Sequence, residues 1–277
     1  ERALAMTNLD DNRLVKTFAG LRSADKKALL PFITAGYPDL ETTRALLHDF
    51  ERRGVRVCEL GIPFSDPIAD GPTIQASYGE TLARGVRVGQ ILEMVRRYRE
   101  AGGRLALVAM VSYSIIFRRH PEAWLAAARE AGFDATIVPD LSLEEAGGFE
   151  PLAASCGMAN VMLVAPTTPQ ERKLRIAAHS RGFIYYVSVA GITGERDRLP
   201  PETTAAVSDL RKHTDTPICV GFGISNPQTV RGVCEAADGA IVGSAIVRRI
   251  SDAKDAPRER LVEQVGRFVG ELLAPLL

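Results

Sequence analysis

Short apolar runs alternate with longer amphipathic segments along most of the chain. Eight apolar runs predict strands, at residues 28–34, 55–60, 105–110, 135–138, 161–164, 183–188, 218–221 and 240–242. Segments with apolar residues at helical spacing predict helices at residues 12–23, 40–53, 88–101, 121–131, 142–156, 169–180, 203–213, 226–236 and 257–273. Because the strands are apolar on both faces and are separated by helices, we predict a parallel sheet covered on both sides.

The number of strand–helix units favours a closed barrel. A (β/α)8 TIM barrel typically takes ~250 residues, so eight units fit this chain better than an open, doubly wound sheet does. The helix at 12–23 precedes the first strand and is an addition to the barrel. No linker, low-complexity tract or charge block divides the chain, so we predict one domain over residues 1–277. Residues 1–12 are expected to be flexible or in part left over from expression.

Charge and composition exclude several classes of partner. The chain has 34 Lys and Arg against 34 Asp and Glu, and this balance argues against a nucleic-acid or anionic membrane-surface binder. No apolar run approaches the ~20 residues that span a bilayer. The four cysteines are scattered without a C-x-x-C pair, which favours a reduced, cytoplasmic setting. All four histidines fall on predicted helices or their ends, so no metal site is expected.

Glu59 closes the second predicted strand and is the first candidate for chemistry. By strand alternation Val55, Val57 and Glu59 share one face. A carboxylate among apolar neighbours is costly unless it is paired or used. Two interpretations follow: a structural ion pair with an arginine inside the barrel, or a general acid/base whose pKa is changed by burial.

Two further acids, Asp66 and Asp70, lie on the long loop after this strand. Each occurs in an ordinary turn sequence, S-D-P or A-D-G, where Asp commonly bonds its own backbone. Either residue alone is therefore well explained as a turn residue. Together with Glu59, however, they place several carboxylates at the same mouth of the barrel, where TIM barrels carry their active sites.

Glycine-bearing turns follow the seventh and eighth predicted strands. Gly221 and Gly223 occur in the first turn, and Gly243 and Ser244 occur in the second. Small residues at these two strand ends let backbone N–H groups approach an anion at a helix N-terminus. We therefore predict a phosphate site there, shared with Gly194 of the sixth loop. These turns contain no Lys or Arg, so the helix dipole would supply the positive potential.

Tyr185 and Tyr186 lie near the end of the sixth predicted strand. Because neighbouring residues of a strand point to opposite faces, one tyrosine faces the barrel interior and the other faces the helices. Both could be core aromatics, or the inward one could contact a ligand.

Five segments together resemble the tryptophan synthase α chain family. They read PFITAGYPD at 31–39, ELGIPFSDPIADGPTIQ at 59–75, YYVSVAGITG at 185–194, GFGIS at 221–225 and GAIVGSAIV at 239–247. The resemblance runs from about residue 13 onward. It implies a carbon–carbon lyase of tryptophan biosynthesis, which cleaves indole-3-glycerol phosphate to indole and glyceraldehyde 3-phosphate by a retro-aldol step.

The resemblance also implies roles for individual residues. It makes Glu59 and Asp70 the catalytic residues. It assigns substrate contacts to Phe32, Ile74, Tyr185 and Thr193, phosphate contacts to Gly194, Gly221, Gly223, Gly243 and Ser244, and a partner-facing place in the loop to Pro63 and Asp66. Some family members carry an arginine where this chain has Val189; Arg196 or Arg198 would have to replace it.

The implied partner is a tryptophan synthase β chain, in a heterotetramer of two α and two β chains. The pyridoxal phosphate of that assembly is expected in the β chain, and no cofactor is expected in this one. Three alternatives stay open at this point: a stand-alone lyase that releases free indole, a non-catalytic sugar-phosphate-binding barrel, and another phosphate-binding barrel such as an epimerase or isomerase. The Glu59–Asp70 pair argues against the second alternative.

Overall fold

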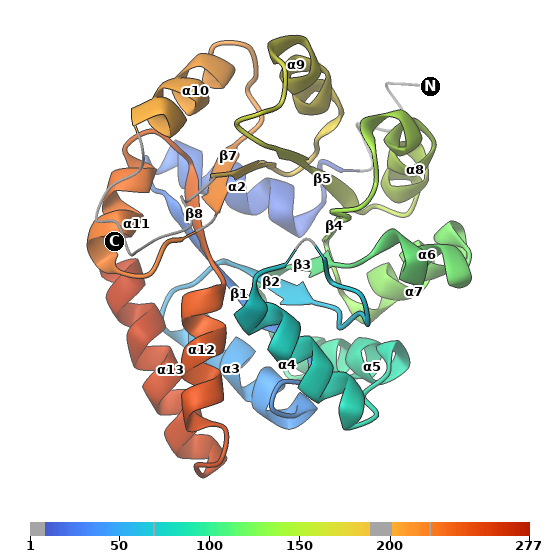
Figure 1. The fold of residues 1–277 in the computed structure, drawn as a ribbon, viewed down its shortest axis with the longest axis vertical. Helices are drawn as coiled ribbons and strands as arrows, with labels where there is room; N and C mark the ends of the chain where they lie inside the picture. The colour runs from blue at the N-terminus through green and yellow to red at the C-terminus, as the bar shows by residue number, and fades with distance from the viewer. Residues whose placement is uncertain (1–8, 69, 189–200, 222) are drawn as a thin grey trace.

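Eight parallel strands close into a barrel at the centre of the molecule (Figure 1). The computed structural model describes residues 9–68, 70–188, 201–221 and 223–277. The strands are β1 (Ala28–Thr34), β2 (Val57–Gly61), β3 (Ala106–Met110), β4 (Ala135–Ile137), β5 (Ala159–Val164), β6 (Ile184–Val187), β7 (Ile218–Gly221) and β8 (Gly239–Val242). Each strand pairs with the next and β8 pairs with β1, which confirms the predicted TIM barrel.

Nine helices agree with the sequence pattern. They are α2 (Arg13–Ser23), α3 (Leu40–Arg52), α5 (Val88–Glu100), α7 (Pro121–Ala131), α8 (Leu143–Ser155), α9 (Gln170–His179), α10 (Pro201–Arg211), α11 (Pro227–Cys234) and α13 (Arg258–Leu273). All except α2 surround the barrel, as a parallel sheet buried on both faces requires (Figure 1).

The structure adds helices that the pattern did not predict: α4 (Pro72–Ala83), α6 (Tyr113–Arg118), α12 (Ser244–Ala253) and the short 3-10 helix η1 (Ala274–Leu276). The buried face of α4 is Ser77, Tyr78 and Thr81, so it has no apolar stripe. The six residues of α6 are too few to show a period. Apolar residues of α12 follow almost directly on the apolar residues of β8, so the sequence pattern did not separate the helix from the strand. None of the helices within the described ranges is long and apolar enough to cross a membrane.

Strand β2 begins two residues later than predicted, at Val57. Val55 lies before the strand and packs in the apolar layer between barrel and helices, not on the face of Glu59. The prediction for Val55 was therefore wrong, because strand alternation holds only within the strand itself.

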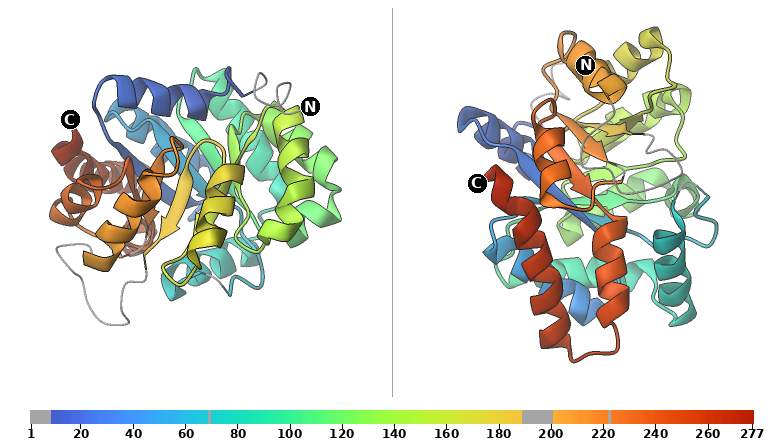
Figure 2. Two further views of the ribbon diagram at one scale, coloured as in Figure 1. Left: turned by 90° about the horizontal axis from the view of Figure 1, so that it is seen from above. Right: turned by 60° about the vertical axis from the view of Figure 1, so that its left-hand side comes forward.

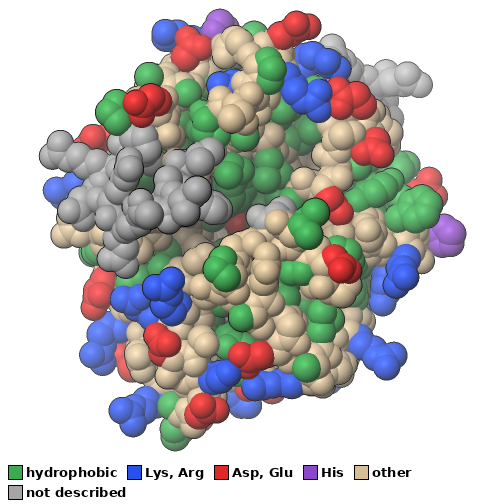
Figure 3. Space-filling model, in the orientation of Figure 1, with side chains coloured by type: hydrophobic (Ala, Val, Ile, Leu, Met, Phe, Trp, Pro, Cys, Tyr) green, Lys and Arg blue, Asp and Glu red, His purple; other side chains and the backbone are tan. Residues whose placement is uncertain are grey.

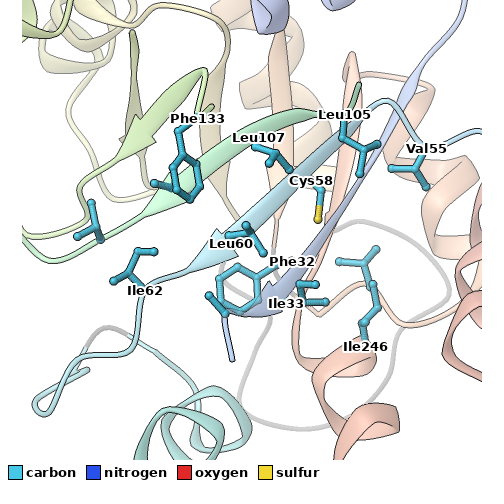
Figure 4. Packing of buried hydrophobic residues seen from close by; sticks show 14 of the residues in the cluster. Phe32, Ile33, Val55, Cys58, Leu60, Ile62, Leu105, Leu107, Phe133 and Ile246 are labelled. Atoms are coloured by element: carbon cyan, nitrogen blue, oxygen red, sulfur yellow. The ribbon is translucent and has the colours of Figure 1, made fainter. Parts of the chain in front are cut away.

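Two apolar layers flank the strands. The interior cluster lies within the barrel and under α2, and it contains Leu14, Phe18, Ala28, Leu30, Val57, Ala106, Val108, Ala135, Ile137, Ala159, Val161, Phe183, Cys219 and Ile241. A larger outer cluster fills the space between the strands and the surrounding helices. Figure 4 shows part of it around β1 and β2, including Cys58, Leu60 and Leu107.

Helix α2 closes the end of the barrel where the strands begin. Its Leu14 and Phe18 are buried in the interior cluster, and the rings of Phe18 and Phe183 lie 5.6 Å apart. Figure 2 shows α2 at one end of the barrel and α4 at the other. Asn12 caps α2 and donates to the backbone carbonyls of Asp134 and Gly157. Helix α2 does not cover the opposite end of the barrel, where the strands terminate and where the predicted active-site residues lie.

Asp134 organises the closed end through a buried ion network. Its fully buried carboxylate binds Arg13 at 2.9 Å, Arg99 at 3.0 Å and Arg129 at 3.3 Å. It also accepts from the backbone N–H of Leu107 at 3.0 Å. One carboxylate thus joins α2, α5 and α7 to the start of β3, and each of its contacts is charge-assisted.

Candidate active site

Glu59 projects into the barrel interior near the carboxyl end of β2. It lies in register with Phe32 of β1 and Val108 of β3. The side chain is fully buried, and neither carboxylate oxygen has a hydrogen-bond partner in the described part of the chain. Burial raises the pKa of Glu59 from 4.5 to about 8. Among the described residues there is thus no structural ion pair with an arginine, and Glu59 is a carboxyl group that holds its proton near neutral pH.

Asp70 lies on the loop between β2 and α4, immediately before Gly71, the N-cap of α4. It is half-buried, and burial raises its pKa from 3.8 to about 6. Together with Tyr78 and Met110 it lines a cavity of about 270 Å3. Near neutral pH this carboxyl group is therefore mostly ionised, in contrast to that of Glu59.

Two tyrosines, Tyr78 and Tyr185, lie near both carboxyl groups. The pKa of Tyr78 and that of Tyr185 are both raised, first by burial and then by the charges of Glu59 and Asp70. Coulomb interactions of this kind fall off with distance, so both phenols lie within electrostatic reach of both carboxyl groups. Tyr78 was not among the predicted site residues, because it lies on α4, which the sequence pattern did not reveal.

Tyr185 is the inward-facing member of the tyrosine pair. It packs against the interior cluster, whereas Tyr186 is fully buried in the outer cluster. A Cβ atom built on Gly221 would lie 2.4 Å from the Tyr185 hydroxyl oxygen. Gly221 ends β7 and is buried. Its missing side chain therefore makes room for the Tyr185 phenol.

Phe32, Ile74 and Gly243 meet at the same end of the barrel. A Cβ atom built on Gly243 would lie 3.5 Å from the Phe32 ring and 3.7 Å from Cδ1 of Ile74. A Cβ atom built on Gly61 would come within 2.5 Å of both the Phe32 ring and the Tyr78 hydroxyl. Gly61 is thus a further residue that shapes the site, and its position inside the quoted 59–75 segment was the only sequence signal for it.

Two helix N-termini converge beside this apolar wall. Gly243 is the N-cap of α12, and Ser244 is the exposed first residue of that helix. A Cβ atom built on Gly71, the N-cap of α4, would lie 4.0 Å from Ser244 Oγ. The first N–H groups of a helix have no intrahelical acceptor, and the helix dipole favours an anion there. The structure therefore brings two such ends together, where the sequence had indicated one.

The turn after β7 contains Gly223, a further predicted phosphate contact. Gly223 is exposed and has φ of 73°, a left-handed conformation that favours glycine. Ser225 follows, and its hydroxyl oxygen is buried without a hydrogen-bond partner among the described residues. Ser225 was quoted in the GFGIS motif but was not predicted as a site residue. Thr193, Gly194 and Val189 lie outside the described residues.

A family model for the tryptophan synthase alpha chain matches residues 18–273. The chain belongs to this family. It is 43% identical over 268 residues to the tryptophan synthase alpha chain of Rhodopirellula baltica, covering 94% of this chain and 96% of that one. It is 46% identical over 258 residues to that of Prochlorococcus marinus, covering 92% of each chain. The resemblance inferred from the sequence motifs is confirmed, and with it the assignment as a carbon–carbon lyase of tryptophan biosynthesis.

Solved structures of the family share the whole barrel. The tryptophan synthase subunit alpha of Legionella pneumophila superposes with a TM-score of 0.88 at 35% identity, over 96% of this chain and 98% of that one. A chain described under the mutual activation of a tryptophan synthase complex of two α and two β subunits from Pyrococcus furiosus has a TM-score of 0.83 at 35% identity. It covers 90% of this chain and 99% of that one.

The loop after β2 exposes apolar surface in this member of the tryptophan synthase alpha chain family. Pro63 is buried and Asp66 is exposed, with its carboxylate 2.6 Å from Ser65 Oγ. Ile68, two residues further along, is 93% exposed, and Phe117 at the end of α6 is 66% exposed. Figure 3 shows hydrophobic side chains gathered over this face.

A groove lies between that loop and α6. It has a volume of about 570 Å3, and it is lined by Pro63, Phe64, Ser65, Asp66, Leu82, Val86, Arg87, Val88, Ile91, Ser114, Ile115, Arg118 and Arg119.

In the described ranges, no group of three or more His, Cys, Asp or Glu side chains could hold a metal ion.

Proposed function

We propose that Glu59 and Asp70 carry out the reaction of this family, the cleavage of indole-3-glycerol phosphate to indole and glyceraldehyde 3-phosphate. The observation that carries the assignment is the pair of carboxyl groups near the end of the barrel: Glu59 is fully buried without a hydrogen-bond partner among the described residues, and Asp70 is half-buried beside a cavity. Glu59 is buried with a pKa of about 8, and Asp70 is half-buried with a pKa of about 6. Two acids whose environments separate their pKa values commonly divide the acid and base roles of one reaction.

Glu59 moves the protons in this proposal. Cleavage requires a proton on indole C3 of the substrate. It also requires the loss of a proton from the substrate hydroxyl on the carbon bonded to C3. The C–C electron pair returns to the ring as the hydroxyl carbon becomes a carbonyl, so one proton is gained and one is lost. A buried carboxyl group with no competing partner among the described residues can serve both transfers. Phe32, its neighbour in register, would hold the indole ring beside it.

Asp70 stabilises charge. Protonation at C3 places positive charge on the indole ring, and a fixed anion near the ring N–H lowers the energy of that state. Asp70 is ionised in this range of pH and lines the cavity at the barrel mouth. Ile74 and Tyr185, with Thr193 from the sixth loop, complete the proposed substrate contacts.

The phosphate group would lie at the convergent helix N-termini. Gly223, Gly243 and the backbone and hydroxyl of Ser244 are the proposed ligands, with Gly194 and Gly221 in supporting places. Support comes from the approach of Gly71 to Ser244, which brings the positive ends of two helix dipoles to one point. Gly223→Val should weaken binding of glycerol phosphate, because valine does not adopt a φ of 73° without strain.

The decisive experiment for this assignment is indole production from indole-3-glycerol phosphate by the chain and by Glu59→Gln. We expect turnover by the chain and loss of turnover in the variant, with glycerol phosphate affinity retained. Equal turnover of the two proteins would remove Glu59 from its role. Asp70→Asn should lower kcat more than it raises KM, since its charge is used in the transition state.

For the partner we propose a β chain in an assembly of two α and two β chains. The alpha chains of this family carry no cofactor of their own, and pyridoxal phosphate would lie in the β chain. The exposed Ile68 and Phe117 support a contact face around the loop that carries Pro63 and Asp66. Phe117→Asp should weaken co-purification with a β chain while basal indole production is retained, because Phe117 is exposed on α6 and not on the loop that carries Asp70. Indole release that a β chain leaves unchanged would favour the stand-alone lyase instead.

We propose a cytoplasmic setting for this enzyme. Its four cysteines, Cys58, Cys156, Cys219 and Cys234, are all free thiols in the structure, and three of them are buried. Free buried thiols are typical of proteins kept in a reducing compartment.

A further inference from the structure

One side chain closes the loop that carries Asp70. The side-chain amide of Gln75 donates hydrogen bonds to the backbone carbonyl of Pro67 at 3.1 Å and to that of Asp70 at 2.7 Å. The backbone N–H of Asp70 donates to the same Pro67 carbonyl at 3.1 Å. A glutamine amide has two N–H groups, and here both are directed at the turn. The backbone of Asp70 is thus held from its N–H and from its carbonyl.

Gln75 projects from a helix that is itself fixed to the barrel. In the next turn of α4, Ser77 and Thr34 are buried and their hydroxyl oxygens lie 2.6 Å apart, which ties α4 to the end of β1. Further along, the Glu80 carboxylate accepts from Lys254, the C-cap residue of α12, at 2.8 and 2.9 Å. The position of Gln75 is therefore set by β1 and α12, and Gln75 transmits that position to the loop.

Position 75 requires both the N–H donors of a glutamine side chain and its length, because the amide must reach the carbonyls of Pro67 and Asp70. Methionine has similar length without a donor, and a glutamate carboxylate would present acceptors to two carbonyl oxygens. Gln75 is exposed, so its side chain fills no part of the core, and its replacement should leave the stability of the fold close to that of the parent. The effect of its loss should therefore fall on the loop.

We propose that Gln75 is a positioning residue that holds Asp70 in its working place at the barrel mouth. The proposal rests on the catalytic role assigned to Asp70 above. In this proposal Gln75 does not contact the substrate. Gln75 affects the reaction only by holding the backbone of Asp70, and with it the Asp70 carboxylate, in place.

The test compares Gln75→Met with Gln90→Met. Gln90 is likewise exposed and accepts from a helix-end N–H, that of Arg87 at 2.9 Å, but it lies on α5 away from the site. We expect kcat for indole formation to fall on the order of 10- to 100-fold in Gln75→Met, the scale of a misplacement of about 1 Å. Gln90→Met should retain the parent kcat, and Gln75→Met should unfold at the parent temperature. Parent kcat in Gln75→Met would overturn the proposal.

A double-mutant cycle separates positioning from a general loop defect. In an Asp70→Asn background, Gln75→Met should have less than about a third of its single-mutant effect on kcat, because the two residues act as one unit. Independent, multiplicative effects would show that Gln75 does not act through Asp70, and the proposal would fail.

A third measurement does not depend on turnover. The pKa of Asp70, followed by carboxyl-carbon NMR in the intact chain, should move from about 6 toward the ordinary 3.8 in Gln75→Met, because a released loop returns the carboxylate to water. An unchanged pKa would overturn the proposal. If the parent chain makes no indole yet the shift is seen, the proposed function fails while the positioning of Asp70 by Gln75 stands.

Discussion

The Tyr185 hydroxyl occupies the place where a side chain on Gly221 would begin. A Cβ atom there would lie 2.4 Å from the hydroxyl oxygen and 2.7 Å from the ring carbon that bears it. The two residues come from adjacent strands, β6 and β7, so neither backbone can move aside without disturbing the barrel. The phenol and the glycine therefore form one unit.

Gly221→Ala should displace Tyr185 from the site. We expect kcat/KM for indole-3-glycerol phosphate to fall on the order of 10- to 100-fold, because the ring must shift by about 1 Å. Gly232→Ala is the matched control: a Cβ atom there meets nothing within 4 Å, and alanine in a helix is favoured by about 1 kcal/mol. Steady-state kinetics of both variants make the comparison. Unchanged kinetics in Gly221→Ala would show that Tyr185 does not contact the substrate.

Glu59→Gln should change how stability depends on pH. The pKa of Glu59 is about 8 in the folded chain against 4.5 as its ordinary value. Between these values the folded state keeps a proton that the unfolded state has lost. The contribution of Glu59 is thus fully present below pH 4.5 and is lost as pH rises through 8, by roughly 1.4 kcal/mol per pH unit.

Denaturant unfolding at pH 5 and pH 8 measures that change. The Gln variant should gain several kcal/mol relative to the parent over this interval, in order of magnitude. Glu271→Gln, an exposed change on α13, should gain nothing over the same interval. Parallel stability curves for the parent and Glu59→Gln would mean that Glu59 is solvated.

The rate of cleavage should follow a bell-shaped pH profile. If Asp70 works as the anion and Glu59 donates the first proton, kcat/KM rises through about pH 6 and falls through about pH 8. Asp70→Asn should remove the acidic limb of the enzyme profile and leave the basic limb. Persistence of both limbs in Asp70→Asn would assign the acidic limb to another group, such as the substrate phosphate.

Asp134→Ala should destabilise the barrel without changing its chemistry. The substitution leaves Arg99, only 13% exposed, without its carboxylate partner. Removal of one member of a buried ion pair costs about 3–5 kcal/mol. Arg13→Ala, at a guanidinium that is 40% exposed, should cost no more than about 1 kcal/mol. The kcat of folded Asp134→Ala should equal that of the parent, since the network lies at the end of the barrel opposite Asp70.

Much of the site was readable from the chain. Strand alternation correctly placed Glu59 on the face of Val57, and it required one of Tyr185 and Tyr186 to face inward. It did not say which, and only the resemblance selected Tyr185. Alternation failed for Val55, which precedes the strand.

The protonation of the site could not be read from the chain. Glu59 and Asp70 are ordinary carboxylic acids in the sequence, and their pKa values are raised because the fold buries them, Glu59 inside the barrel and Asp70 on the loop between β2 and α4.

The sequence by itself determined the eight strand–helix units, and through them the barrel, because apolar periodicity within a segment reports which faces that segment must bury. It also carried the motifs that place the chain in its family. Only the tertiary structure decided that α4 exists, that its N-cap Gly71 approaches Ser244, and that Gln75 reaches back to Asp70. The polar helix α4 has no periodic signal of its own, and the approach of Gly71 to Ser244 joins segments over 170 residues apart, a distance set by barrel closure.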